Sequence, residues 1–80
     1  MIDRELTPNS KWKHFKRGIY LVIGTARNSE DPNQEFVLYK HLDGESEFGL
    51  DQLWIRPKKM FLEQVPRDGK TFWRFEKIEE

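Results

Sequence analysis

A cluster of basic and aromatic residues surrounds His14 near the start of the chain. Trp12 and Phe15 flank it, and four basic residues are interleaved with them within three positions of His14. These are Lys11, Lys13, Lys16 and Arg17. Grooves that bind single-stranded nucleic acid combine cationic side chains with aromatic rings on which bases stack. The cluster therefore indicates a nucleic-acid or nucleotide contact. The alternative is that the two aromatic residues close one end of a barrel while the lysines keep a strand edge solvated and unpaired.

A second candidate contact is the pair Trp54 and Arg56. Side chains two apart on a strand share one face, so these two point the same way. If Leu53 and Ile55 point inward, the pair faces outward and can stack on a base, a peptide or a planar anion. A register shifted by one residue reverses every face. Trp54 would then enter the core and Arg56 would pair with an acid, either Glu63 or Glu30.

The segment Arg27-Asn28-Ser29-Glu30-Asp31 offers a guanidinium, a hydroxyl and carboxylates within one turn. It is either a binding loop or a turn that caps its own backbone, with Arg27 paired to an acid, and the composition favours the capped turn. Two tyrosines, Tyr20 and Tyr39, fall on neighbouring predicted strands. They either line a shallow pocket with Trp54, as aromatic cages for cations do, or cover the core.

Catalytic chemistry has little support. Ser29 or Ser46 with His14 or His41 as base is formally available, but no nucleophile elbow accompanies either serine. Two histidines far apart in sequence make no recognisable metal site. The acidic stretch from Asp43 to Asp51 lacks the spacing of a calcium loop, so we interpret it as solvated surface. We predict no catalytic residue, metal or cofactor.

The sequence thus predicts a small non-catalytic binding domain that contacts nucleotide or nucleic acid through an aromatic and basic face. A protein or peptide adaptor is the alternative, and a small enzyme is the least favoured. Its partner is otherwise unknown, and a monomer or weak dimer is expected. The candidate ligand-binding residues are His14, Lys16, Arg27, Trp54 and Arg56.

Length and composition restrict these possibilities further. Eighty residues suffice for one domain. With 14 basic and 14 acidic residues the net charge is zero, so nucleic-acid binding requires a local patch. There is no cysteine, which excludes disulfides and a thiol nucleophile. Apolar runs are far shorter than the ~20 residues of a membrane-spanning helix, and no signal peptide is visible. A cytoplasmic location without membrane contact is expected.

The expected elements are short and mostly β. Residues 1–10 form a flexible leader, and a single domain occupies 11–80. Strands are predicted over 15–26, 35–42, 53–56 and 71–78, with a loop at 27–34 and turns at 43–44 and 67–70. Pro57 ends one strand and starts a helical turn reaching Phe61, after which 62–65 either continues that turn or returns to a strand. Trp73 and Phe75 are assigned to the core. Together these elements favour a small SH3-like antiparallel barrel of about five strands with one short helical turn.

Several short motifs between Trp12 and Ile78 occur in a recognisable order. They are His14-Phe15-Lys16, Gly18, Tyr20, Val22, Gly24, Ala26-Arg27, Ser29-Glu30, Val37, Tyr39, Trp54-x-Arg56-Pro57, Met60-Phe61, Glu63, Val65, Arg74-Phe75 and Ile78. In these the chain resembles the bacterial DUF1653 family, a family of unknown function. The resemblance implies an SH3-like barrel but no activity or ligand. Two positions depart from the family pattern: Arg17 stands between Lys16 and Gly18, and Asn28 replaces a frequent histidine. A role that needs that imidazole is therefore not expected here.

Overall fold

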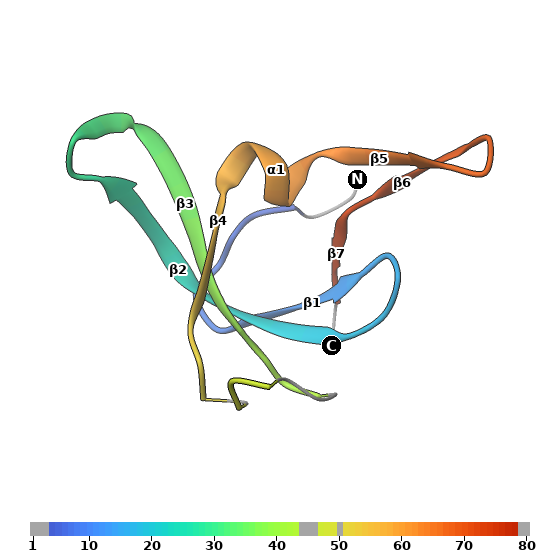
Figure 1. Ribbon diagram of the computed structural model, residues 1–80, viewed down its shortest axis with the longest axis horizontal. Helices are drawn as coiled ribbons and strands as arrows, with labels where there is room; N and C mark the ends of the chain where they lie inside the picture. The colour runs from blue at the N-terminus through green and yellow to red at the C-terminus, as the bar shows by residue number, and fades with distance from the viewer. Residues whose placement is uncertain (1–3, 44–46, 50, 79–80) are drawn as a thin grey trace.

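The computed structural model describes residues 4–43, 47–49 and 51–78. Strands alternate with tight turns along the chain, and one short helix precedes the last hairpin (Figure 1). The elements are β1 (Ser10–His14), β2 (Ile19–Asn28), β3 (Asp31–His41), β4 (Trp54–Pro57), α1 (Lys58–Leu62), β5 (Gln64–Arg67), β6 (Lys70–Trp73) and β7 (Phe75–Lys77).

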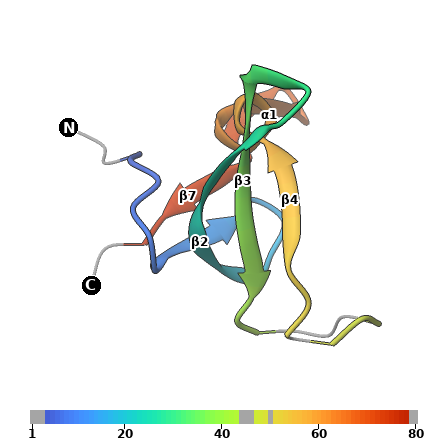
Figure 2. The same ribbon diagram turned by 90° about the vertical axis from the view of Figure 1, so that its left-hand side faces the viewer.

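The strands form a curved five-stranded sheet and a separate two-stranded ribbon. The sheet has the order β4-β3-β2-β1-β7 with every neighbouring pair antiparallel, and β5 pairs only with β6. The mostly β class and the single helical turn are therefore confirmed. The predicted barrel is not closed, because β4 and β7 remain the two edges of the sheet (Figure 2).

The longest hairpin joins β2 and β3, and it corrects the loop predicted for 27–34. Strand pairing continues to Asn28 and Asp31, so the turn itself is only two residues long. The polar side chains act as expected for a capped turn. The Asn28 side-chain oxygen accepts a hydrogen bond from the backbone N–H of Glu30 at 2.9 Å, and an Asp31 carboxylate oxygen accepts one from the backbone N–H of Asn33 at 3.2 Å. Turn-forming residues therefore tighten a hairpin here without interrupting its strands.

Pro57 and the Asp68-Gly69 pair behave as the sequence predicts. Pro57 is the N-cap of α1, and the chain returns to a strand at Gln64. Asp68 and Gly69 have φ angles of 52° and 76°, which are the positive values a primed hairpin turn requires. Asp68 thus adopts a left-handed conformation that few other side chains tolerate as well.

The last predicted strand, 71–78, is broken at Arg74. Its backbone N–H donates to the carbonyl of Glu63 at 3.0 Å, and its own carbonyl accepts from the N–H of Phe15 at 3.0 Å. The chain therefore leaves the ribbon at Trp73 and enters the main sheet at Phe75.

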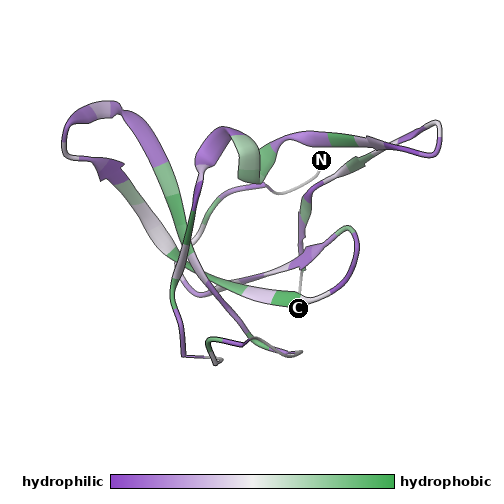
Figure 3. Ribbon diagram, viewed as in Figure 1, coloured by the Kyte–Doolittle hydropathy of each residue, from purple (hydrophilic) through white to green (hydrophobic). Residues whose placement is uncertain are grey.

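The core is small and rich in aromatic rings. Among the described residues, six buried side chains form it: Trp12, Val22, Val37, Tyr39, Phe61 and Phe75. Phe61 of α1 stacks on Phe75 with 4.0 Å between ring centroids, which fastens the helix to the sheet. Figure 3 shows hydrophobic residues in the middle of β2 and β3 and at the end of α1, whereas the β2–β3 tip is hydrophilic.

The assignment of Trp73 to the core needs correction, and residues 4–9 explain why. Phe75 is buried, but Trp73 remains partly exposed and lies under the Arg4 guanidinium, 3.9 Å from its ring centroid. Arg4 also donates to the carbonyls of Phe75, at 2.9 Å, and Leu62, at 3.1 Å. Residues 4–9 contain no helix or strand, yet Arg4 covers an aromatic ring that the sheet leaves open.

Candidate functional site

The orientation of β4 places Trp54 and Arg56 on the concave side of the sheet. Trp54 packs against the core and the Arg56 guanidinium lies 5.5 Å from the Phe75 ring centroid, whereas Ile55 is 61% exposed on the opposite face. The outward-facing alternative is therefore wrong. Arg56 does not pair with Glu63 or Glu30: its Nε donates to the Tyr39 hydroxyl at 3.3 Å.

Beside this pair lies a small cavity of about 220 Å³, which we call the aromatic pocket. Its walls come from β1, β2, β3, β4 and β7. They consist of His14, Tyr20, Tyr39, His41, Trp54, Arg56 and Phe75. Tyr20 meets Tyr39 edge to face with ring centroids 5.7 Å apart, and it lies tilted against His41 with centroids 4.5 Å apart. Because Arg56 already supplies a cation, the pocket is unsuited to the cationic ligand of an aromatic cage.

A second cavity, of about 520 Å³, lies between β4 and the ribbon where the barrel is open; we call it the basic cleft. Its walls are His14, Phe15, Lys16, Arg56, Val65, Pro66, Arg67 and Arg74. No acidic residue is among them. A chain with zero net charge therefore concentrates four cationic side chains and a histidine at one cleft, and a local positive potential follows.

Two of those cations have carboxylate partners and two do not. Arg74 contacts Glu63 at 2.6 Å and Arg67 contacts Asp68 at 3.9 Å. Within the described part of the chain, Arg56 and Lys16 have no carboxylate partner. Arg56 is partly buried, and apart from Nε the donors of its guanidinium have no hydrogen-bond partner among these residues. These donors are not buried, so they are open to solvent beside the cavity and available to a planar anion.

His14 lines both cavities and is held neutral. Burial lowers its pKa from the ordinary value of 6.5, and the nearby charges of Arg56, Arg74 and Lys16 lower it further. Its Nδ1 accepts from the backbone N–H of Lys16 at 3.2 Å. The neutral imidazole therefore carries its proton on Nε2, where it can donate to a ligand.

The lowered pKa of His14 predicts a loss of stability in acid. Below pH 6.5 the unfolded chain takes up a proton on His14 before the folded chain does, so the free energy of unfolding decreases as the pH falls from about 6.5 toward the lower folded pKa. Urea unfolding of the wild type and His14→Gln between pH 7.5 and 5.5 measures this. The wild type is expected to lose more stability on acidification than the variant, and equal losses would contradict the prediction.

Four of the five predicted site residues meet around these two cavities, and Arg27 does not. His14, Lys16, Trp54 and Arg56 line one or both. Arg27 lies near the tip of the β2–β3 hairpin, which extends away from the β1–β2 loop (Figure 1). There it donates to the carbonyl of Pro32 at 2.7 Å and contacts Glu35 at 3.9 Å. The predicted pairing of Arg27 with an acid is thus observed.

The structure adds Arg67 and Arg74 to the basic side chains. Arg67 is the first residue of a predicted turn and Arg74 was placed inside a continuous strand, so no periodicity brought either one to Arg56. In the structure Arg67 ends β5 and Arg74 lies between β6 and β7, and both line the cleft. Two further predictions, the turn at Gly44 and the candidate nucleophile Ser46, lie outside the described residues.

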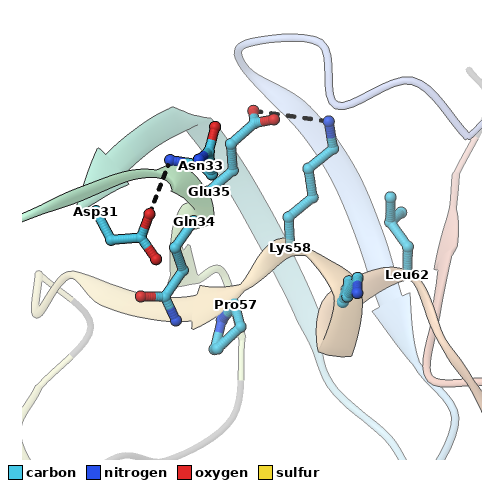
Figure 4. Close-up of a pocket in the computed structure, with 8 residues that line it drawn as sticks. Asp31, Asn33, Gln34, Glu35, Pro57, Lys58 and Leu62 are labelled. Carbon is cyan, nitrogen blue, oxygen red and sulfur yellow. Dashed lines mark hydrogen bonds and ion pairs between the residues drawn. The ribbon is translucent and has the colours of Figure 1, made fainter.

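A larger cavity of about 780 Å³ lies between the β2–β3 hairpin and α1 (Figure 4). Its wall is mixed in charge, with Asp31 and Glu35 facing Lys58 and Lys59. Glu35 contacts Lys58 at 3.7 Å and is shared with Arg27. The charges of this cavity therefore compensate one another, so it attracts an anion less strongly than the basic cleft does.

Across the described ranges, no group of three or more His, Cys, Asp or Glu side chains is placed to hold a metal ion. Nor does any helix in these ranges have the length and apolar character needed to cross a membrane.

Fold and site together define an open all-β domain with a basic cleft and an aromatic pocket at the unclosed side of its sheet. A family model described as "Protein of unknown function (DUF1653)" matches residues 10–77. The chain belongs to this family. A crystal structure of a DUF1653 protein from Bordetella bronchiseptica is similar, with a TM-score of 0.73 and 25% sequence identity over 90% of this chain and 87% of that one. No curated protein is significantly similar.

Proposed function

We propose that this domain is a non-catalytic binding module for phosphate-bearing ligands of the nucleotide and single-stranded nucleic-acid class. The observation that carries the proposal is the state of Arg56, which is partly buried and lacks a carboxylate partner within the described residues. Guanidinium groups match phosphate oxygens in a planar, bidentate geometry. Lys16, Arg67 and Arg74 on the same cleft supply further positive charge.

The experiment is a calorimetric titration with a single-stranded oligothymidylate of eight nucleotides at several salt concentrations. The association constant is expected to fall as salt is added. A plot of its logarithm against the logarithm of the salt concentration should have a slope of about −0.7 for each phosphate that is neutralised. Arg56→Gln is expected to weaken binding at least ~10-fold, because a lost charge-assisted hydrogen bond costs about 1.5 to 3 kcal/mol.

Arg27→Gln is the matched control. It removes the same charge from the far hairpin, so the affinity should change less than ~2-fold. Equal losses in Arg56→Gln and Arg27→Gln would show a nonspecific charge effect and refute a site at the cleft. Absence of binding to the wild type would refute the proposal altogether.

A protein or peptide adaptor is the second candidate, favoured by a different surface. Strand β4 is an edge of the sheet, and beside it Leu53 and Ile55 are 47% and 61% exposed. An extended apolar peptide could add a strand to such an edge. Its affinity would depend little on salt, whereas oligonucleotide affinity would depend on it strongly. The cytoplasmic location expected from the sequence stays a prediction.

A further inference from the structure

The aromatic pocket and the basic cleft share two side chains. His14 and Arg56 belong to the walls of both cavities. A group seated in the pocket and a group seated in the cleft therefore contact the same guanidinium and the same imidazole. The two cavities therefore adjoin at His14 and Arg56, and a ligand that reaches from one to the other passes along both side chains.

The two cavities differ in chemistry. The pocket is lined mostly by rings, with Tyr20, Tyr39 and Trp54 on three adjoining strands. The cleft has Lys16, Arg67 and Arg74 in addition to the shared residues. The first suits a planar, uncharged ring and the second a multiply charged anion.

Polar groups in the pocket remain available to a ring with hydrogen-bonding edges. Among the residues that the structure describes, the Tyr20 hydroxyl and the His41 imidazole have no hydrogen-bond partner. A phenol and an imidazole each can donate or accept, which suits the mixed donors and acceptors of a nucleobase. A purely hydrocarbon ring would leave both groups unpaired.

From these features we propose that the site takes a single unpaired nucleobase in the aromatic pocket and its phosphate in the basic cleft. This inference rests on the proposed function and specifies its ligand more closely. The ligand is then a free mononucleotide or one nucleotide of a single strand. With about 220 Å³ the pocket holds one base, and a base within a duplex is stacked and paired and does not reach it.

The test compares ligands by calorimetry: adenosine 5′-monophosphate, uridine 5′-monophosphate and ribose 5-phosphate, which has the phosphate but no base. At least one mononucleotide is expected to bind at least ~10-fold more tightly than ribose 5-phosphate, as expected when a base stacks on aromatic side chains. Tyr20→Ala and, independently, His41→Ala should reduce that ratio while leaving the affinity for ribose 5-phosphate within ~2-fold. Using both variants guards against one failing to fold, and Ile55→Ala on the outer face of β4 is the matched control.

The two sources of the nucleotide are separated with nucleic acids. Linear and circular single strands of the same sequence are both expected to bind more tightly than a blunt duplex, in which every base is stacked and paired. Tight binding of mononucleotides but not of the single strands would identify the free nucleotide as the ligand. Equal affinity for the single strands and the duplex would overturn the requirement for an unpaired base.

Failure of this inference is distinguishable from failure of the proposed function. If ribose 5-phosphate binds as tightly as the mononucleotides and Arg56→Gln weakens all of them, the base pocket is refuted but the phosphate site stands. If none of these ligands binds, both proposals are refuted.

Discussion

Replacing Phe75 by alanine is expected to lower the free energy of unfolding by about 3 to 5 kcal/mol. Phe75 is 1% exposed, and its ring contacts rings from β1, β2, β3 and α1. It stacks on Phe61 of α1 and meets Tyr20 and Tyr39 edge to face, with centroids 5.5 and 5.9 Å apart. Its loss removes the stacking partner of Phe61, which keeps its ring contacts with Trp12 and Tyr39, and leaves a cavity that these rings cannot fill.

Phe72→Ala is the matched control, because Phe72 is the same residue type three positions earlier and is 38% exposed. Phe72→Ala should lower the free energy of unfolding by about 1 kcal/mol. Urea unfolding followed by circular dichroism measures both variants. A small domain has a total stability of only about 5 to 15 kcal/mol, so Phe75→Ala should be substantially unfolded at modest urea concentrations. Similar costs for the two variants would contradict the packing described for β7.

Replacing Trp54 by alanine is expected to lower the free energy of unfolding by about 2 to 3 kcal/mol, which is less than the loss expected for a fully buried tryptophan. Trp54 packs against the core but also lines the aromatic pocket, so part of its surface contacts no protein. Its Nε1–H is buried without a hydrogen-bond partner in the described residues, which lowers its net contribution.

The adjacent residue tests the register of β4. Ile55→Ala should cost less than about 0.5 kcal/mol, because 61% of Ile55 is already exposed. The two variants are compared by urea unfolding under the same conditions. A larger cost for Ile55→Ala than for Trp54→Ala would mean that β4 presents the opposite face to the core.

Features fixed by a few neighbouring residues were predictable from the sequence. Asp68 and Gly69 supply two positive φ angles, and Pro57 starts a helical turn, so the β5–β6 hairpin and α1 lie where expected. The segment 27–34 was mistaken for a loop because its turn residues are numerous. Their side chains cap a two-residue turn, and strand pairing continues on both sides.

Features that depend on distant contacts were not predictable in the same way. Alternation placed Trp54 and Arg56 on one face, but the choice of face depended on where Phe75 and Tyr39 would lie. The break between β6 and β7 lies at Arg74, whose backbone bonds to Glu63 and Phe15, residues distant in the sequence. Arg27 was grouped with the site residues because its residue type fits a binding site, but no pattern in the sequence indicates how far it lies from them in the fold.

The pairing of β1 with β7 has a consequence for how the domain forms. Trp12 lies opposite Lys77, so a strand near the start of the domain completes its hydrogen bonds only with the last strand. Such a pairing closes a loop of more than sixty residues, which slows folding relative to local contacts. During synthesis the β2–β3 hairpin can form early, but Trp12 stays incompletely covered until Phe75 has emerged from the ribosome. The interval between these events is when the nascent chain is most exposed to aggregation and proteolysis.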